Sequence, residues 1–352
     1  MAETPSQILE ALIPQVRHHA RISDAGFWGY YSTCGLLMRL RSLYRFEHGL
    51  SPWERADESP VPTWIGELEK QWPALEDTAL SPITIDGHKY DPYDTEGINA
   101  ALIPAGLYYG MGQGLFMKPV VFLAELAGRR TLMGRDVVIT GREFVRDLST
   151  HPAMHREGTI IVRRTLAWEL IWDRYAESCS KERCSILRSA FSAYGIPDSA
   201  GHAALGPVVD GEVEVMVRHE LGESVSSDLL GSGWIDMLAA LGHSRTALDL
   251  RAIKDAAADT CPEGPLSYII EGRREGQLGF FVASFGGLRT VLAPEVRLAY
   301  EAFLIDHDWT RIESTRRACH EKVLGLCMEL LCQFAALGAG PEFSGMVSAA
   351  FG

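Results

Sequence analysis

Residues 308–337 read DWTRIESTRRACHEKVLGLCMELLCQFAAL. The stretch contains apolar side chains at spacings of three, four and seven residues, namely Ile312, Cys319, Val323, Leu326, Leu330 and Phe334. Residues at these spacings lie on one face of an α-helix, because the helix completes a turn in about 3.6 residues. The pattern therefore predicts one long helix that is buried along this stripe.

Other stretches share this periodicity and have recognisable helix ends. A helix over 181–194 ends at Gly195, and a helix that Asp24 caps ends at Gly49, since glycine adopts the left-handed conformation that closes helices. Residues 51–54, SPWE, have the capping-box pattern of a new helix start. The sequence predicts further helices over 158–177, 212–224, 245–259 and 294–306.

Two stretches predict β-hairpins. Residues 83–90, ITIDGHKY, place Asp86-Gly87 between short β-prone runs, and residues 130–140, RTLMGRDVVIT, have a similar form around a turn. Asp-Gly favours the two-residue turns of hairpins. We therefore expect a mainly α, multi-helix globular protein with one or two small β-hairpin insertions.

The length of 352 residues fits either two domains or one large helical body. Helical periodicity lapses over residues 195–211, GIPDSAGHAALGPVVDG. This predicts an N-terminal helical region with small hairpins over 1–200 and a C-terminal helical region over 201–352. The alternative is that the loop joins helices of one shared core.

The composition indicates which partners to expect. Acidic residues outnumber basic ones by 46 to 33, a formal net charge of −13, which repels nucleic acids and anionic membranes. The 7 scattered cysteines fit reduced thiols, and the N-terminal MAETPSQILEAL lacks the pattern of a secretory signal. We expect a cytoplasmic protein whose partner is a small molecule or another protein.

One uncharged stretch tests this expectation. Residues 98–117, INAALIPAGLYYGMGQGLFM, are long enough to span a bilayer. Asn99, Pro104, Gln113 and several glycines make the stretch less apolar than a typical membrane-spanning helix. We expect a hairpin buried in the core rather than a membrane span.

The sharpest motif is HELGE at 219–223, which differs from the zinc-protease pattern His-Glu-x-x-His in its last residue. On a helix, His219 and Glu223 project from one face, and Glu212 lies two turns before His219 on the same side. Two carboxylates and an imidazole suit iron, manganese or zinc better than calcium. The motif therefore predicts a divalent metal held by Glu212, His219 and Glu223.

Glu220 is turned by about a hundred degrees from His219 on the same helix, which suits a proton-transfer role better than metal ligation. The segment also has a plain alternative. Its apolar stripe, Val213, Met216, Val217 and Leu221, predicts an amphipathic helix whose polar face carries histidine and glutamate without binding anything. The missing second histidine removes the feature that makes the zinc-protease pattern specific.

A second set of candidate residues is basic. The predicted helix over 26–49 places Arg41 and Arg45 on one stripe. Guanidinium groups bind carboxylates and phosphates, so both arginines are candidates for binding an anionic cofactor or substrate. The alternative, which the acidic composition favours, is that they pair with carboxylates of the protein itself.

Three separated stretches carry a resemblance. FWGYYSTCGLLMRLRSLYRFEHGLSPWE (27–54), DPYDTEGINAAL (91–102) and RHELGE (218–223) together resemble an uncharacterised bacterial protein family. That family has no assigned activity, so the resemblance implies a bacterial origin and supplies no catalytic residue.

Two functions follow as hypotheses. The first is a metal-dependent enzyme that uses Glu220 for proton transfer and the metal to polarise a substrate or to activate water or dioxygen. The second is a noncatalytic helical interaction or accessory protein, in which the 8 tryptophans and the aromatic first helix build cores and partner surfaces.

Overall fold

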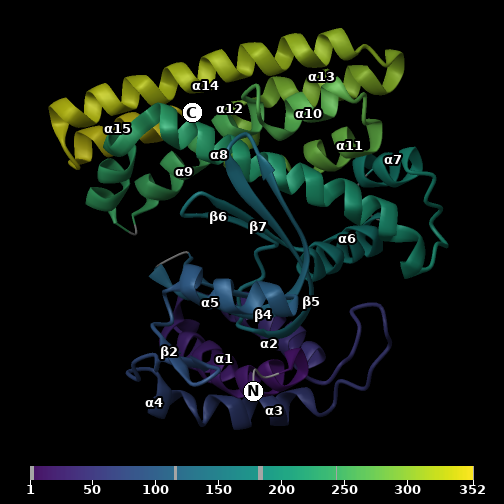
Figure 1. The fold of residues 1–352 in the computed structure, drawn as a ribbon. Coiled ribbons are helices and arrows are strands. Elements are labelled where there is room, and N and C mark those ends of the chain that lie inside the picture. The colour runs from purple at the N-terminus through teal and green to yellow at the C-terminus, as the bar shows by residue number, and fades with distance from the viewer. Residues whose placement is uncertain (1–3, 115–116, 181–184, 243, 352) are drawn as a thin grey trace. The chain divides into compact units, whose positions relative to one another are not determined.

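The computed structural model describes residues 4–114, 117–180, 185–242 and 244–351. It divides into two compact units. Figure 1 shows the fold coloured by residue number. The first unit comprises Met1–Pro152 and Ile161–Glu169, and the second comprises Ala153–Ile160 and Leu170–Gly352. The stretch 195–211, at which the sequence predicts a division, lies inside the second unit.

The first unit begins with helices and continues into strands. Its elements are α1 (Pro5–Phe27), η1 (Trp28–Tyr30), α2 (Thr33–Glu47), α3 (Val61–Glu69), α4 (Trp72–Leu75), β1 (Ile83–Ile85), β2 (His88–Tyr90), α5 (Thr95–Leu102), η2 (Ile103–Ala105), β3 (Leu107–Gln113), β4 (Pro119–Leu132) and β5 (Arg135–Arg146). The chain then forms β6 (Ala153–Arg156), β7 (Thr159–Arg163) and α6 (Arg164–Ser178). It passes between the units before β6, within β7 and again within α6.

Three hairpins have turns of the same kind. Asp86-Gly87, Met133-Gly134 and Glu157-Gly158 each connect two strands, and both residues of every turn have positive φ. This is the type I′ turn, whose twist matches the right-handed twist of antiparallel strands. The hairpins predicted at 83–90 and 130–140 are confirmed.

The β structure is larger than the sequence predicts. The described residues are 64% helix and 14% strand, so the protein is mainly α. However, β3, β4, β5, β7 and β6 form one five-stranded sheet in that order. The predicted hairpin at 130–140 is the outer end of two long strands of this sheet. Register shifts between β4 and β5 near Ala124 and Leu126 are bulges of the kind that bend and twist a sheet.

The core of the first unit lies between α1, α5 and one face of the sheet. Alternate residues of β3 and β4, such as Tyr109 and Leu123, point into it and meet Leu12 and Val16 of α1. Ile98 of α5 is also fully buried there. The uncharged stretch 98–117 is therefore not a hairpin by itself: its described part contains the end of α5, then η2 and β3. No described helix is both long enough and apolar enough to cross a membrane.

The second unit is helical apart from β6 and the start of β7. Its helices after α6 are α7 (Ser185–Ala193), η4 (His202–Leu205), α8 (Gly206–Leu241), α9 (Arg245–Thr260), α10 (Pro265–Glu271), α11 (Glu275–Ser284), α12 (Leu288–Leu292), α13 (Pro294–Asp306), α14 (Trp309–Leu337) and α15 (Pro341–Ala349). Gly231 has a non-helical backbone, so α8 consists of two helices joined at a kink.

Figure 1 shows α14 as a long helix that runs past α13, α8 and α15 in the second unit. The predicted apolar stripe faces the core: Ile312, Cys319, Val323 and Leu330 are buried. Leu326 and Phe334 are partly buried against the core cluster that contains Val323 and Leu330. Asp308 caps the helix through hydrogen bonds from the backbone amides of Thr310 and Arg311. The predictions for α9 and α13 are confirmed as well.

Of three helix predictions in the first half, the one at 51–54 is wrong, and those over 24–48 and 158–177 are right only in their later parts, which form α2 and α6. Asp24 does not begin a helix, because α1 continues through it to Phe27 and Ser32 caps α2. Residues 51–54 form only a turn, and Arg45 binds the carbonyls of Ser51 and Glu54 that a helix would use. Residues 159–163 are β7, since the Glu157-Gly158 turn precedes the β-branched run TIIV. The start of the helix predicted over 181–194 lies outside the described residues, and α7 covers its remainder.

Candidate functional site

His219 of α8 lies in a cluster of charged side chains from α8, α9 and α12. Its Nδ1 is 2.8 Å from Oδ1 of Asp259 at the end of α9. The other oxygen of Asp259 accepts a hydrogen bond of 2.7 Å from Nη1 of Arg289 on α12. The side chain of Asp259 is 2% exposed, whereas that of His219 is 26% exposed. A buried carboxylate therefore fixes the orientation of an imidazole that solvent can reach.

The second nitrogen of His219 faces its own helix. Nε2 lies 3.4 Å from Oε1 of Glu223, one turn later on α8. Oε2 of Glu223 is 3.7 Å from Nζ of Lys254 on α9. The predicted pairing of His219 and Glu223 on one helix face is therefore present, and Lys254 contacts the second oxygen of Glu223.

Burial alone lowers the pKa of His219, but the charge and hydrogen bond of Asp259 outweigh it and hold that pKa well above 6.5. The pKa of Asp259 is lowered, because His219 and Arg289 together outweigh the effect of its burial. Asp259 therefore favours the protonated form of His219.

Two further carboxyls belong to the cluster. Burial raises the pKa of Glu220 to about 7. Burial and the neighbouring Glu223 raise that of Asp255 to about 7. Glu223 instead has its pKa lowered to about 2, because hydrogen bonding and charge from His219 overcome its burial. The cluster thus contains groups that take up and release protons near neutral pH beside groups that keep their charge.

Glu212, the third predicted metal ligand, has different neighbours. It lies seven residues before His219, a rise of about 10 Å along an α-helix, and its Oε1 accepts a hydrogen bond of 3.4 Å from the Tyr194 hydroxyl. Burial raises the pKa of Glu212 to about 8. Within the described part of the chain, no group of three or more His, Cys, Asp or Glu side chains is arranged to hold a metal ion. The geometry brings Glu223 to His219 but does not assemble the predicted metal centre.

Arg41 and Arg45 belong to the first unit and share a carboxylate. Nε of Arg41 donates to Oε1 of Glu58 at 2.8 Å, and Nη1 of Arg45 lies 3.4 Å from the same oxygen. Arg45 also donates to the carbonyl of Glu54 at 2.7 Å. Both predicted anion-binding arginines thus have partners within their own unit.

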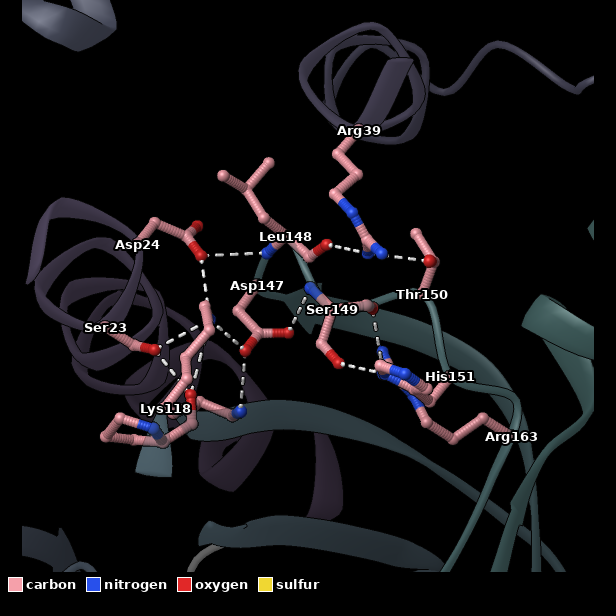
Figure 2. Close-up of polar contacts among 12 residues, drawn as sticks. Ser23, Asp24, Arg39, Lys118, Asp147, Leu148, Ser149, Thr150, His151 and Arg163 are labelled. Atoms are coloured by element: carbon pink, nitrogen blue, oxygen red, sulfur yellow. Dashed lines mark hydrogen bonds and ion pairs between the residues drawn. The ribbon is translucent and has the colours of Figure 1, made fainter. Parts of the chain in front are cut away.

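A buried polar cluster in the first unit, shown in Figure 2, was missed in the sequence. Nζ of Lys118 lies 2.7 Å from Asp147, 3.1 Å from Asp24 and 2.8 Å from the Ser23 hydroxyl. All four side chains are almost completely buried. Burial raises the pKa of Asp24 to about 6 although Lys118 lowers it. One lysine therefore compensates two buried aspartates.

The same cluster fixes the loop that follows β5. The backbone amide of Leu148 donates to Asp24 at 2.9 Å, and that of Ser149 donates to Asp147 at 3.0 Å (Figure 2). Arg39 of α2 donates to the carbonyl of Leu148 at 2.9 Å. These contacts satisfy buried backbone groups, so the cluster positions the loop.

Comparison with known proteins gives two matches that together span most of the chain. Residues 11–163 match the N-terminal domain of a family of unknown function, DUF6866. Residues 168–344 match the C-terminal domain of the same family. The gap between the two matched segments, residues 164–167, lies within the segment Ile161–Glu169 of the first unit. No curated protein and no solved structure matches the chain. The chain therefore belongs to the DUF6866 family of unknown function and contains both of its domains.

Proposed function

We propose that the second unit carries an acid–base catalytic site in which His219 donates the proton and Asp259 positions it. The observation that supports this proposal is the 2.8 Å hydrogen bond between His219 Nδ1 and the buried Asp259. A carboxylate on Nδ1 fixes the tautomer and ring orientation of a histidine and stabilises its protonated form, as in catalytic His–Asp pairs.

The surroundings of the pair suit this role. Arg289 holds the second oxygen of Asp259, so the carboxylate cannot rotate away from the imidazole. The raised pKa of His219 keeps a proton available at neutral pH for a leaving group. Glu220, whose pKa is about 7, is the proposed general base that accepts a proton during the reaction. A general base is most effective when its pKa lies near the working pH.

The reaction class follows from the donor. A positioned imidazolium accelerates the cleavage of bonds whose leaving atom needs a proton, such as those of esters, amides and phosphomonoesters. Lys254 and Arg289 place two further positive charges at the cluster. We therefore infer that the substrate is a small polar molecule that becomes more negative as it reacts.

One observation favours a second candidate, a noncatalytic accessory protein. The ion pairs His219–Asp259, Arg289–Asp259 and Lys254–Glu223 connect α8, α9 and α12. A buried network of this kind also fixes how helices pack without any chemistry. In that case the cluster is structural, and the family acts by binding partners.

A turnover experiment separates the two candidates. Purified protein is incubated with a panel of small esters, amides, lactones and phosphomonoesters, and the products are followed by mass spectrometry. For a turned-over compound, we expect His219→Gln to reduce the rate by about a hundredfold or more, the usual contribution of a general acid. His307→Gln serves as the matched control, since His307 is 59% exposed and contacts Glu275 instead.

Circular dichroism and melting temperature must first show that both variants are folded. Turnover that persists in His219→Gln contradicts the acid–base proposal. If the wild type turns over no compound, while His219→Gln lowers the melting temperature, the structural role of the cluster is favoured.

A further inference from the structure

A second feature of the helical unit is a pocket of about 310 Å³ between the ends of α7, α8, α10 and α11. It is lined by Ala193, Tyr194, Gly211, Tyr268, Arg274, Glu275, Gly276 and Gln277. Ligand pockets span about 300–1,000 Å³, so this one suits a small molecule. It is separate from the His219 cluster, none of whose residues lines it.

The ring of Tyr194 forms one wall and depends on two glycines. A Cβ atom on Gly211 would lie 2.5 Å from the Tyr194 hydroxyl oxygen, and one on Gly276 would lie 2.4 Å from its ring. Both separations are below van der Waals contact, so a side chain at either position would displace the tyrosine. The Tyr194 hydroxyl donates to Glu212 at the back of this wall. The wall is therefore closely packed.

Gln277 lines the pocket with an unused acceptor. The residue is 4% exposed, and its Nε2 donates to the carbonyl of Gly211 at 2.7 Å. Its Oε1 is buried and accepts no hydrogen bond from the residues that the structure describes. A buried carbonyl oxygen without a donor costs about 1–3 kcal/mol, and a ligand N–H would satisfy it.

Arg274 and the start of α11 supply donors for an anion. The Arg274 guanidinium stacks 3.7 Å from the centre of the Tyr268 ring and donates through Nη1 to the Tyr268 carbonyl. Both of these contacts are with Tyr268, and no carboxylate among the described residues forms a salt bridge with Arg274. No side chain caps α11, whose first backbone N–H groups, at Gly276 and Gln277, lack intrahelical acceptors.

We propose that this pocket binds an amino carboxylate, a small molecule in which an N–H group lies next to a carboxylate. Arg274 and the start of α11 bind the carboxylate, and Gln277 Oε1 accepts the N–H. Glu275 also lines the pocket, but it is drawn toward His307, 3.5 Å away. A free α-amino acid and the C-terminal residue of a peptide both have this chemistry.

The test begins with the wild-type full chain. Free L-amino acids and their N-acetyl derivatives are screened by thermal shift, and the best compound is measured by titration calorimetry. Its methyl ester, which lacks the negative charge, and its deaminated acid, which lacks the N–H, serve as ligand controls. We expect each control to bind at least about tenfold more weakly, a difference of about 1.4 kcal/mol.

Protein variants provide the second comparison. We expect Arg274→Gln to weaken binding of the best compound at least about tenfold and Arg274→Lys to have an intermediate effect, since lysine keeps the charge but not the planar fork. Arg273→Gln is the matched control, because Arg273 is exposed and does not line the pocket. If Arg274→Gln does not fold, the ligand controls on the wild type still decide.

The outcomes differ clearly. Preference for the free amino acid assigns the pocket to a metabolite, and preference for the N-acetyl form assigns it to a peptide C-terminus. The proposal is overturned if neither kind of compound binds, or if the methyl ester and the deaminated acid bind as tightly as the amino carboxylate. Binding that is equal in Arg274→Gln and Arg273→Gln overturns it as well.

Discussion

His219 and Asp259 form a hydrogen-bonded pair whose two members differ in their access to solvent. Nδ1 and Oδ1 are 2.8 Å apart, the carboxylate is almost completely buried, and the imidazole is about one-quarter exposed. The buried anion therefore favours the charged form of an imidazole that lies at the surface of the helical unit.

This relationship predicts the titration of His219. Replacing Asp259 by Asn removes the negative charge but leaves the imidazole mostly enclosed, so we expect the pKa of His219 to fall toward or below its ordinary 6.5. In the wild type, the raised pKa stabilises the native state below about pH 6.5, and this stabilisation is lost as the pH rises through the folded pKa. Histidine NMR titration of both proteins measures the change. An unaltered pKa in Asp259→Asn would show that Asp259 does not control the charge.

Glu212 predicts a pH dependence of the same sign, over a pH range that begins lower. Its folded pKa of about 8 exceeds the ordinary value of 4.5, so the native state loses stability as the pH rises between these values, by up to about 1.4 kcal/mol per pH unit. Glu212→Gln removes this loss and keeps an acceptor for the Tyr194 hydroxyl. We expect the variant to gain stability relative to the wild type between about pH 5 and pH 9. Urea unfolding of both proteins at about pH 5 and pH 9 tests this. A difference in unfolding free energy that is the same at both pH values contradicts the prediction.

The metal hypothesis makes a separate prediction. His219 and Glu223 provide two ligand atoms 3.4 Å apart, but Lys254 already contacts Glu223, and a cation near a ligand disfavours metal binding. We expect protein purified without an affinity tag to contain no stoichiometric iron, manganese or zinc, and chelation to leave its melting temperature unchanged. Elemental analysis decides. Stoichiometric metal that His219→Ala removes would restore the metal-dependent enzyme.

The sequence predicts helices well where their stabilising contacts repeat along one face. The stripe from Ile312 to Phe334 identifies α14 because each contact recurs within a few residues. The five-stranded sheet escapes this reasoning, since β3 contains Gly110 and Gly112 and the outer part of β4 is polar. Its strands are recognisable only when paired, and pairing depends on residues distant in the sequence.

The candidate site divides in the same way. Helical spacing correctly joins His219 to Glu223, but Asp259 lies 40 residues away and Arg289 a further 30, so no spacing rule connects them. Glu212 shows the limit of such a rule. Two turns of helix return a side chain to the same face, yet they also move it about 10 Å along the axis. At that separation, Glu212 and His219 do not bind the same metal ion.

The Lys118 cluster predicts a large effect on stability. Lys118→Met leaves Asp24 and Asp147 buried without a cation, and breaking a buried ion pair in this way costs about 3–5 kcal/mol. Adding Asp24→Asn should recover part of that loss, because one of the two uncompensated charges disappears. Lys70→Met is the control: its pair with Glu67 is largely exposed, so we expect a cost of at most about 1 kcal/mol. Urea unfolding measures all three, and equal effects at Lys118 and Lys70 would contradict the role of the cluster.

Gly110 predicts how tightly the sheet is packed. It lies opposite Phe122 in the β3–β4 register, and a Cβ atom there would be 2.0 Å from the Phe122 ring. The ring has no room to move, because it is fully buried and the Arg163 guanidinium carbon lies 4.4 Å from its centre. We expect Gly110→Ala to destabilise the protein by about 1–3 kcal/mol or more, as overpacking does.

Gly128 provides the control within the same sheet. It lies on β4, and a Cβ atom at this position would meet nothing within 4 Å, so we expect Gly128→Ala to change the free energy of unfolding by no more than about 0.5 kcal/mol. Thermal and urea unfolding of both variants give the comparison. If the two substitutions had equal effects, the ring of Phe122 would have to leave its place at little cost. The contact between Phe122 and Arg163 would then contribute little to this face of the sheet.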